Sequence, residues 1–122
     1  MKEQIKGGEK MSVALEELTQ KVAACQAACN HCYDACLKED DVDMMRECIR
    51  TDNDCSYICG MVLDFAHKDS PLFNDIVELC AKACEACAEE CEKHDHHEHC
   101  LACAKACREC AEACRAYIAK AN

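Results

Sequence analysis

Residues 100–114 have the sequence CLACAKACRECAEAC and carry five cysteines at successive spacings of 3, 4, 3 and 4 residues. Spacings that alternate between three and four place side chains on one face of an α-helix, because the helix turns once every ~3.6 residues. The intervening alanine, lysine, arginine and glutamate residues are good helix formers. A strand would send the same cysteines to both of its faces. The stretch therefore predicts a helix with a thiol face, where an ordinary bundle helix would carry leucine and isoleucine.

The same pattern recurs elsewhere in the chain. Residues 80–91 (CAKACEACAEEC) and 103–114 (CAKACRECAEAC) are identical at nine of twelve positions, and residues 25–36 (CQAACNHCYDAC) keep the C-x3-C-x2-C-x3-C frame. A weaker copy at residues 48–59 has Asp52 where a thiol would fit. The sequence thus predicts four helices, each with one sulfur-rich face, at about residues 11–38, 41–67, 71–92 and 96–120.

Composition narrows the class of protein. The chain has 122 residues with one proline, three glycines and no tryptophan, and its net charge is −10. A chain of this length and composition predicts one all-α domain. The negative charge would repel nucleic-acid phosphates, and no apolar run approaches the ~20 residues of a membrane helix. We therefore expect no nucleic-acid partner and no membrane span.

Sixteen cysteines suit either a disulfide scaffold or a metal-binding protein, depending on the compartment. The first ten residues, MKEQIKGGEK, lack the apolar run of a secretory signal, so we expect a flexible tail at residues 1–10 and a cytoplasmic location. Thiols stay reduced in the cytoplasm, which favours metal binding. Helical neighbours are also ~5–6 Å apart at Cβ, beyond the ~3.5–4.5 Å of a disulfide. Bridges between helices stay open as an alternative.

Short connections predict that residues 11–122 form an antiparallel up-down-up-down four-helix bundle. Asp40 or Asp41 is expected to cap the second helix, and Ser70 followed by Pro71 to start the third. In this topology the sulfur-rich parts of all four faces converge on one half of the core, which opens toward the first and third connections. The other half is closed by apolar side chains, expected to be Leu15, Leu18, Val22, Val62, Phe65, Phe73, Val77 and Tyr117.

This cysteine-lined core predicts metal binding, because leucine or alanine would pack equally well without the risk of oxidation. Thiolates restrict the metal to Cu(I), Zn²⁺ or iron–sulfur clusters, and the cysteine runs typical of ferredoxins are absent. Four Zn²⁺ ions on sixteen thiolates would leave eight negative charges in the core, whereas one Cu(I) per thiolate leaves it neutral. We therefore predict storage of many Cu(I) ions, on the order of one per thiol, without catalysis.

The predicted copper ligands are all the cysteines together with His96 and Met44 at the open end. The cysteines are Cys25, Cys29, Cys32, Cys36, Cys48, Cys55, Cys59, Cys80, Cys84, Cys87, Cys91, Cys100, Cys103, Cys107, Cys110 and Cys114. His96 continues the cysteine spacing of the fourth helix, and imidazole is a common metal ligand. Met44 continues the spacing of the second helix with Met45 beside it, and core packing is an equal alternative for both methionines.

Other polar residues near these cysteines have expected roles of their own. His94, His97 and His99 are expected to be solvated turn residues or weak docking sites, and His31 a surface residue. Asp52 is expected either to orient a metal ligand by accepting a hydrogen bond, or to pair with a cation such as Arg50 or Lys105.

The motifs resemble those of the bacterial copper storage proteins, in particular the cytosolic branch of that family. The resemblance spans about residues 25–114 and rests on the C-x3-C-x2-C-x3-C helices, on residues 48–59 (CIRTDNDCSYIC) and on the histidine-rich turn before Cys100. It implies a four-helix bundle that holds many Cu(I) ions on thiolates matching the sixteen cysteines. It also implies that His or Met residues at the mouth assist uptake, and that the protein assembles as a homotetramer.

Two other functions stay open from the residues themselves. A zinc or general soft-metal buffer of the metallothionein type would saturate near about four ions and prefer Zn²⁺. A thiol redox protein, which is an enzyme, would need an accessible cysteine of low pKa, and a buried face does not provide one. The sequence identifies no copper donor or acceptor protein.

Overall fold

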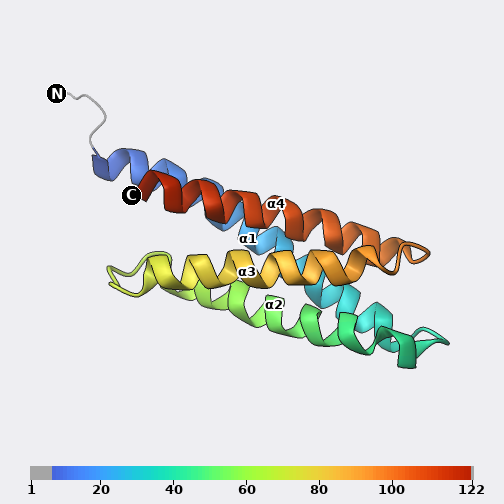
Figure 1. The fold of residues 1–122 in the computed structure, drawn as a ribbon. Helices are drawn as coiled ribbons and strands as arrows, with labels where there is room; N and C mark the ends of the chain where they lie inside the picture. The colour runs from blue at the N-terminus through green and yellow to red at the C-terminus, as the bar shows by residue number, and fades with distance from the viewer. Residues whose placement is uncertain (1–6, 122) are drawn as a thin grey trace.

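Four long helices and one short 3₁₀ helix make up the fold in a computed structural model that describes residues 7–121. The elements are α1 (Gly7–Leu37), η1 (Val42–Met45), α2 (Arg46–Phe65), α3 (Phe73–Glu92) and α4 (Glu98–Ala121). The helices lie side by side as antiparallel rods, and each packs against two others, in the pairs α1–α2, α2–α3, α3–α4 and α1–α4 (Figure 1). The predicted all-α, up-down-up-down bundle is confirmed.

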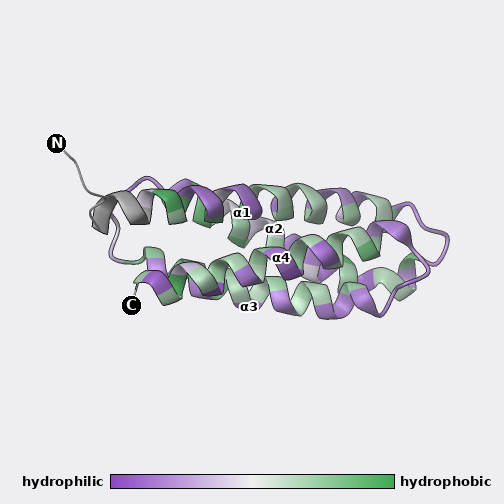
Figure 2. Ribbon diagram, turned by 90° about the horizontal axis from the view of Figure 1, so that it is seen from above, coloured by the Kyte–Doolittle hydropathy of each residue, from purple (hydrophilic) through white to green (hydrophobic). Residues whose placement is uncertain are grey.

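The two ends of the bundle differ in what they contain. The α1–α2 and α3–α4 connections lie together at one end, which we call the mouth, and both are hydrophilic (Figures 1 and 2). The α2–α3 connection lies at the opposite end, with the start of α1 and the end of α4 (Figure 1). We call this the closed end. None of the helices within residues 7–121 is long and apolar enough to cross a bilayer.

The first helix begins earlier than the spacing of its apolar residues indicates. α1 starts at Gly7, ahead of the predicted start at residue 11, because Glu9 and Lys10 are good helix formers that extend it backward. Part of the expected tail of residues 1–10 is therefore helical. Residues 1–6 of that tail, and residue 122 at the other end of the expected domain, lie outside the described residues.

The predicted capping of the second helix by Asp40 or Asp41 is wrong. Asp41 precedes η1 and Met45 precedes α2, and neither makes a side-chain capping bond. The chain enters α2 through a tight turn instead, in which the Met44 N–H donates to the Asp41 carbonyl at 2.9 Å. The Asp41 carboxylate is thereby left to face the histidines of the α3–α4 connection.

The prediction that Ser70 caps the third helix and that Pro71 is its first residue is wrong, because the N-cap of α3 is Leu72. The Ser70 hydroxyl accepts the Leu72 N–H at 3.2 Å in the turn that precedes the helix. The first turn is tight, because the Phe73 N–H donates to the Ser70 carbonyl at 3.2 Å, three residues back. Regular α-helix therefore begins at Phe73 rather than at residue 71.

The closed half of the core is apolar, as predicted. Leu18, Val22, Val62 and Val77 are fully buried, and Leu15 and Phe65 pack against them while partly exposed. Phe73 and Tyr117 meet edge to face, with ring centroids 5.6 Å apart. The buried side chains named here are not metal ligands, so their hydrophobic burial helps to hold the helices together with or without metal.

Leu18→Ala should lower the free energy of unfolding of the reduced apo-protein by about 2–5 kcal/mol, because a side chain only 1% exposed would leave a cavity. Urea denaturation followed by circular dichroism measures the change. Val13→Ala is the matched control on the same helix, since Val13 is 56% exposed and should change stability by about 0.5 kcal/mol or less. Equal losses in the two variants would contradict the apolar core.

Candidate metal centre

All sixteen cysteine side chains point into the core of the bundle. Each is 0% exposed, and each is a free thiol. They come from all four long helices, because the 3–4 spacing turns one face of each helix toward the bundle axis. The predicted cysteine-lined core is confirmed, and it occupies the half of the bundle next to the mouth.

Sulfur atoms of neighbouring helices lie close together without being bonded. The Sγ atoms of Cys48 and Cys91 are 3.5 Å apart, and those of Cys25 and Cys84 are 3.7 Å apart. A disulfide needs ~2.05 Å. Sulfurs placed tetrahedrally around a metal at ~2.3 Å would be about 3.8 Å from one another. The thiols are therefore already spaced for metal–thiolate bonds.

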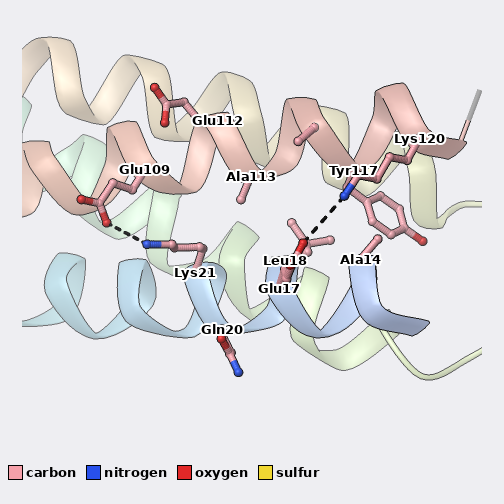
Figure 3. Close-up of a pocket in the computed structure, with 11 residues that line it drawn as sticks. Ala14, Glu17, Leu18, Gln20, Lys21, Glu109, Glu112, Ala113, Tyr117 and Lys120 are labelled. Carbon is pink, nitrogen blue, oxygen red and sulfur yellow. Dashed lines mark hydrogen bonds and ion pairs between the residues drawn. The ribbon is translucent and has the colours of Figure 1, made fainter. Parts of the chain in front are cut away.

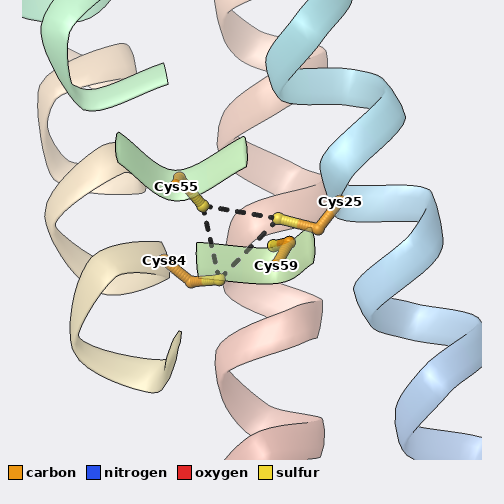
Figure 4. A group of neighbouring side chains, drawn as sticks. All are labelled: Cys25, Cys55, Cys59 and Cys84. Carbon is orange, nitrogen blue, oxygen red and sulfur yellow. Dashed lines mark hydrogen bonds between the residues drawn. The ribbon is translucent and has the colours of Figure 1, made fainter. Parts of the chain in front are cut away.

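The thiols form overlapping sets of four. Figure 4 shows one set, Cys25, Cys55, Cys59 and Cys84, whose sulfurs all lie within 4.8 Å of one another. Other sets of the same kind are Cys25, Cys29, Cys55 and Cys107; Cys29, Cys87, Cys103 and Cys107; Cys32, Cys36, Cys48 and Cys100; and Cys59, Cys80, Cys84 and Cys110. Because several sets share members, ions in adjacent sets would share thiolates. The arrangement suits a continuous array of soft ions better than isolated sites.

Asp52 lies among the thiols and is fully buried. Its Oδ1 atom accepts hydrogen bonds from the thiols of Cys87 at 3.2 Å and Cys103 at 3.4 Å, and its role in orienting metal ligands stays a prediction. Burial, followed by repulsion from neighbouring thiolates, raises the pKa of the Asp52 carboxyl to about 11, so the group is protonated and neutral at pH 7. The expected cation partner Arg50 instead pairs with Glu47 at 3.6 Å on the surface.

His99 covers the set of thiols nearest the mouth. Its Nδ1 atom lies 3.5 Å from the sulfur of Cys32, 3.6 Å from that of Cys100 and 4.0 Å from that of Cys36. Its Nε2 atom lies 2.8 Å from a carboxylate oxygen of Glu39, which assigns the ring proton to Nε2. The Nδ1 lone pair is then directed at the sulfurs, where a metal would need it.

The sequence model of the copper storage protein family matches residues 11–119 of this chain. The chain belongs to the copper storage protein family. It is similar to the Cu(I)-bound copper storage protein BsCsp3, with 45% identity and a TM-score of 0.81 over 86% of this chain and 98% of that one. It is also similar to a cytosolic copper storage protein from Streptomyces lividans solved with five coppers, with 35% identity and a TM-score of 0.86 over 89% and 95% of the two chains.

The chain is also similar to a second cysteine-rich protein. The cysteine-rich protein YhjQ of Bacillus subtilis (strain 168) is 50% identical over 78 residues, which cover 64% of this chain and 71% of the relative.

At the mouth of this copper storage protein, two predicted residues lie elsewhere than expected. Met44 is 69% exposed, and Met45 is the buried methionine, because η1 turns once every ~3.0 residues and shifts the register by one position. His96 is exposed and faces Asp41 at 3.6 Å, so its predicted place on the cysteine face is wrong. α4 begins only at Glu98, which leaves His96 outside the helix.

His99 takes the position that was expected of His96. His99 stands four residues before Cys103 and His96 stands four before Cys100, so both fit the cysteine spacing. Only His99 lies within α4, because the helix begins at Glu98. His94 also differs from its prediction, because it is buried with its Nε2 atom 3.1 Å from Glu90. His31 is exposed as predicted.

The buried thiols do not suit redox chemistry. A reactive cysteine needs an accessible sulfur of low pKa, and every cysteine here is fully buried. Burial, with repulsion from the thiolates of neighbouring cysteines, raises the pKa of the Cys36 thiol even beside the mouth.

A surface pocket between α1 and α4 lies away from the thiols, near the closed end (Figure 3). Two ion pairs cross it, Lys21 with Glu109 at 3.1 Å and Lys120 with Glu17 at 3.7 Å. Its lining includes no cysteine or histidine. This pocket therefore offers no soft ligand to a copper ion.

Asp52→Asn should flatten the pH dependence of stability. The folded pKa of about 11 lies above the unfolded value of ~3.9, so between these pH values the folded protein keeps a proton that the unfolded chain has lost. Wild-type stability therefore falls as pH rises through this window, by at most about 1.4 kcal/mol per pH unit, and an asparagine removes that contribution.

Urea denaturation of the reduced apo-protein between about pH 5 and pH 7.5 measures this slope, because unfolded thiols (pKa ~8.5) are still protonated there. Asp54→Asn is the control, since Asp54 is exposed on the same helix and should keep the wild-type slope. Equal slopes in the wild type and Asp52→Asn would contradict a protonated Asp52.

Proposed function

We propose that this protein stores Cu(I) in the cytosol and binds it through all sixteen core cysteines. The observation that carries this proposal is the continuous array of buried thiols, spaced as metal–thiolate bonding requires. Membership of the copper storage protein family supports it, as does the copper found in the relatives of known structure. The cytosolic location follows the relative from Streptomyces lividans. Copper is cargo in this proposal, and no catalysis is involved.

Charge favours Cu(I) over Zn²⁺ in this core. Among residues 12–121 the buried polar side chains are Asp52, Ser56 and His94, so no lysine or arginine compensates an excess of thiolates. Each Cu(I) replaces one thiol proton and keeps the core neutral, whereas Zn²⁺ bound by four thiolates leaves two negative charges. The neutral Asp52 carboxyl adds no charge that would change this balance. The zinc-buffer alternative therefore fits the structure less well.

The mouth provides the route by which copper reaches the thiols. His99 supplies a nitrogen lone pair beside Cys32, Cys36 and Cys100, so an arriving Cu(I) ion would meet a mixed nitrogen–sulfur site first. Shared thiolates would then pass ions deeper into the core. His96 and Met44 are exposed at the mouth and would contact copper only on its way in.

We also propose a homo-oligomer, with the tetramer implied by the family resemblance. Tyr57 and Met61, which are exposed and four residues apart on α2, form an apolar strip on the outside of the bundle. Such a strip is suited to contact between subunits.

An anaerobic titration of the reduced protein with Cu(I), against a chromophoric competing chelator, tests the proposed storage. Uptake should continue to about one ion per thiol, on the order of 16 per chain, because each thiolate balances one charge. Saturation at one or two ions would contradict storage, and saturation near about four with a preference for Zn²⁺ would favour the zinc buffer.

A variant in which four cysteines are replaced by serine provides a control for this titration. Replacing Cys80, Cys84, Cys87 and Cys91 by serine should lower the capacity by about four ions. Leu79→Ser with Lys82→Ser, at exposed positions of the same helix, should leave it unchanged.

His99→Ala should slow uptake of the first ions by about tenfold while leaving the final capacity close to that of the wild type. The reason is that His99 lines the mouth and is not one of the core thiols. Stopped-flow transfer of Cu(I) from a coloured chelator measures the rate. His31→Ala, at an exposed position on α1, should load at the wild-type rate. A His99→Ala variant that loads equally fast would remove this histidine from the uptake route.

A further inference from the structure

A second group of metal-ligating side chains lies on the outer side of the mouth. It consists of His96 and His97 in the α3–α4 connection and of Asp41 at the start of η1. The rings of His96 and His97 have centroids 4.0 Å apart, and Asp41 faces both. None of the three has a role in holding copper inside the core.

The distances in this group are too long for good hydrogen bonds. Asp41 Oδ1 lies 3.5 Å from His97 Nε2, and Asp41 Oδ2 lies 3.6 Å from His96 Nε2. Hydrogen bonds between nitrogen and oxygen are ~2.7–3.2 Å long. Nitrogen and oxygen ligands at ~2.1 Å from a tetrahedral metal would be about 3.4 Å from each other. Each histidine nitrogen is therefore spaced from the Asp41 carboxylate as two ligands of one cation would be.

His97 provides an independent observation. Its Nε2 atom is buried and has no hydrogen-bond partner. Its other ring nitrogen, Nδ1, lies 3.3 Å from a carboxylate oxygen of Glu39, and Nε2 faces the Asp41 carboxylate at 3.5 Å. A carboxylate behind a histidine whose second nitrogen is free is the arrangement found at metal sites.

We propose that His96, His97 and Asp41 form a binding site for one divalent cation of the Zn²⁺ or Cu²⁺ class. Imidazole and carboxylate ligands suit these borderline ions, whereas Cu(I) prefers the sulfurs of the core. The exposed His96 leaves a side open through which the ion and a water ligand can enter. The net charge of −10 attracts cations to the protein as a whole. The site is separate from the copper store and does not depend on it.

Calorimetric titration of the Cu(I)-loaded protein with Zn²⁺ tests the site, because the core thiols are then occupied. One Zn²⁺ per chain should bind, and His97→Gln or Asp41→Asn should weaken binding at least about tenfold. His31→Gln, an exposed histidine on α1, should bind as the wild type does. Binding that survives His97→Gln would overturn the proposal, as would the absence of binding by both Zn²⁺ and Cu²⁺.

Nitrogen-detected NMR of the histidine rings locates the ion directly. Added Zn²⁺ should shift the Nε2 signals of His96 and His97 and leave that of His31 in place. If the core fails to load, the same measurement is made on the reduced apo-protein with Zn²⁺ in excess of the thiols, which compete for the ion. The His96 and His97 signals should then still shift, so failure of copper storage is distinguishable from failure of this site. Electron paramagnetic resonance with Cu²⁺ as the probe decides which ion the site takes. Coupling of Cu²⁺ to two imidazole nitrogens supports the site with Cu²⁺. The absence of both this coupling and the Zn²⁺-induced NMR shifts overturns the proposal.

Discussion

The structure depends on one electrostatic constraint, which is that a core of sixteen buried sulfurs must stay neutral. No buried lysine or arginine within residues 12–121 is present to balance thiolates, and the one buried carboxyl, Asp52, is itself held in its protonated form. A thiol with its proton and a thiolate with a monovalent cation satisfy the constraint equally. The same packing therefore serves the empty and the filled protein, and exchange of H⁺ for Cu(I) requires no change in the charge of the core.

The division of the core along its axis follows from this constraint. Sulfurs 3.5–4.0 Å apart pack as small apolar groups. Thiols that bind and release copper cannot be the main contacts that hold the helices together. The closed half does that with Leu18, Val22, Val62 and Val77, and with the Phe73–Tyr117 contact. Because the apolar half is stable without metal, the sulfur half can fill and empty while the bundle stays folded.

Helical periodicity was sufficient to predict the bundle and to place every cysteine, because direction around a regular helix depends on spacing alone. It failed where the helices end. Met45 is buried instead of Met44 because a 3₁₀ turn precedes α2, and His99 reaches the sulfurs instead of His96 because α4 starts at Glu98. Asp41 caps no helix, since its carboxylate faces histidines far away in the sequence. Such tertiary contacts leave no mark in the local pattern of residues.

Glu39 links the two groups of ligands that meet at the mouth. One of its carboxylate oxygens lies 2.8 Å from Nε2 of His99 and 3.3 Å from Nδ1 of His97, so it contacts both rings. Each ring presents its other nitrogen in a different direction: His99 toward the sulfurs, His97 toward Asp41. Ligands become softer from the outside inward, from carboxylate and imidazole to imidazole with thiol, and then to thiol alone. A divalent ion suits the carboxylate and imidazole ligands at the outside. Deeper in the core it would either add positive charge or, with four thiolates, leave negative charge that nothing neutralises. A Cu(I) ion that follows the proposed route would gain softer ligands at every step while the core stays neutral, so this order of ligands would favour Cu(I).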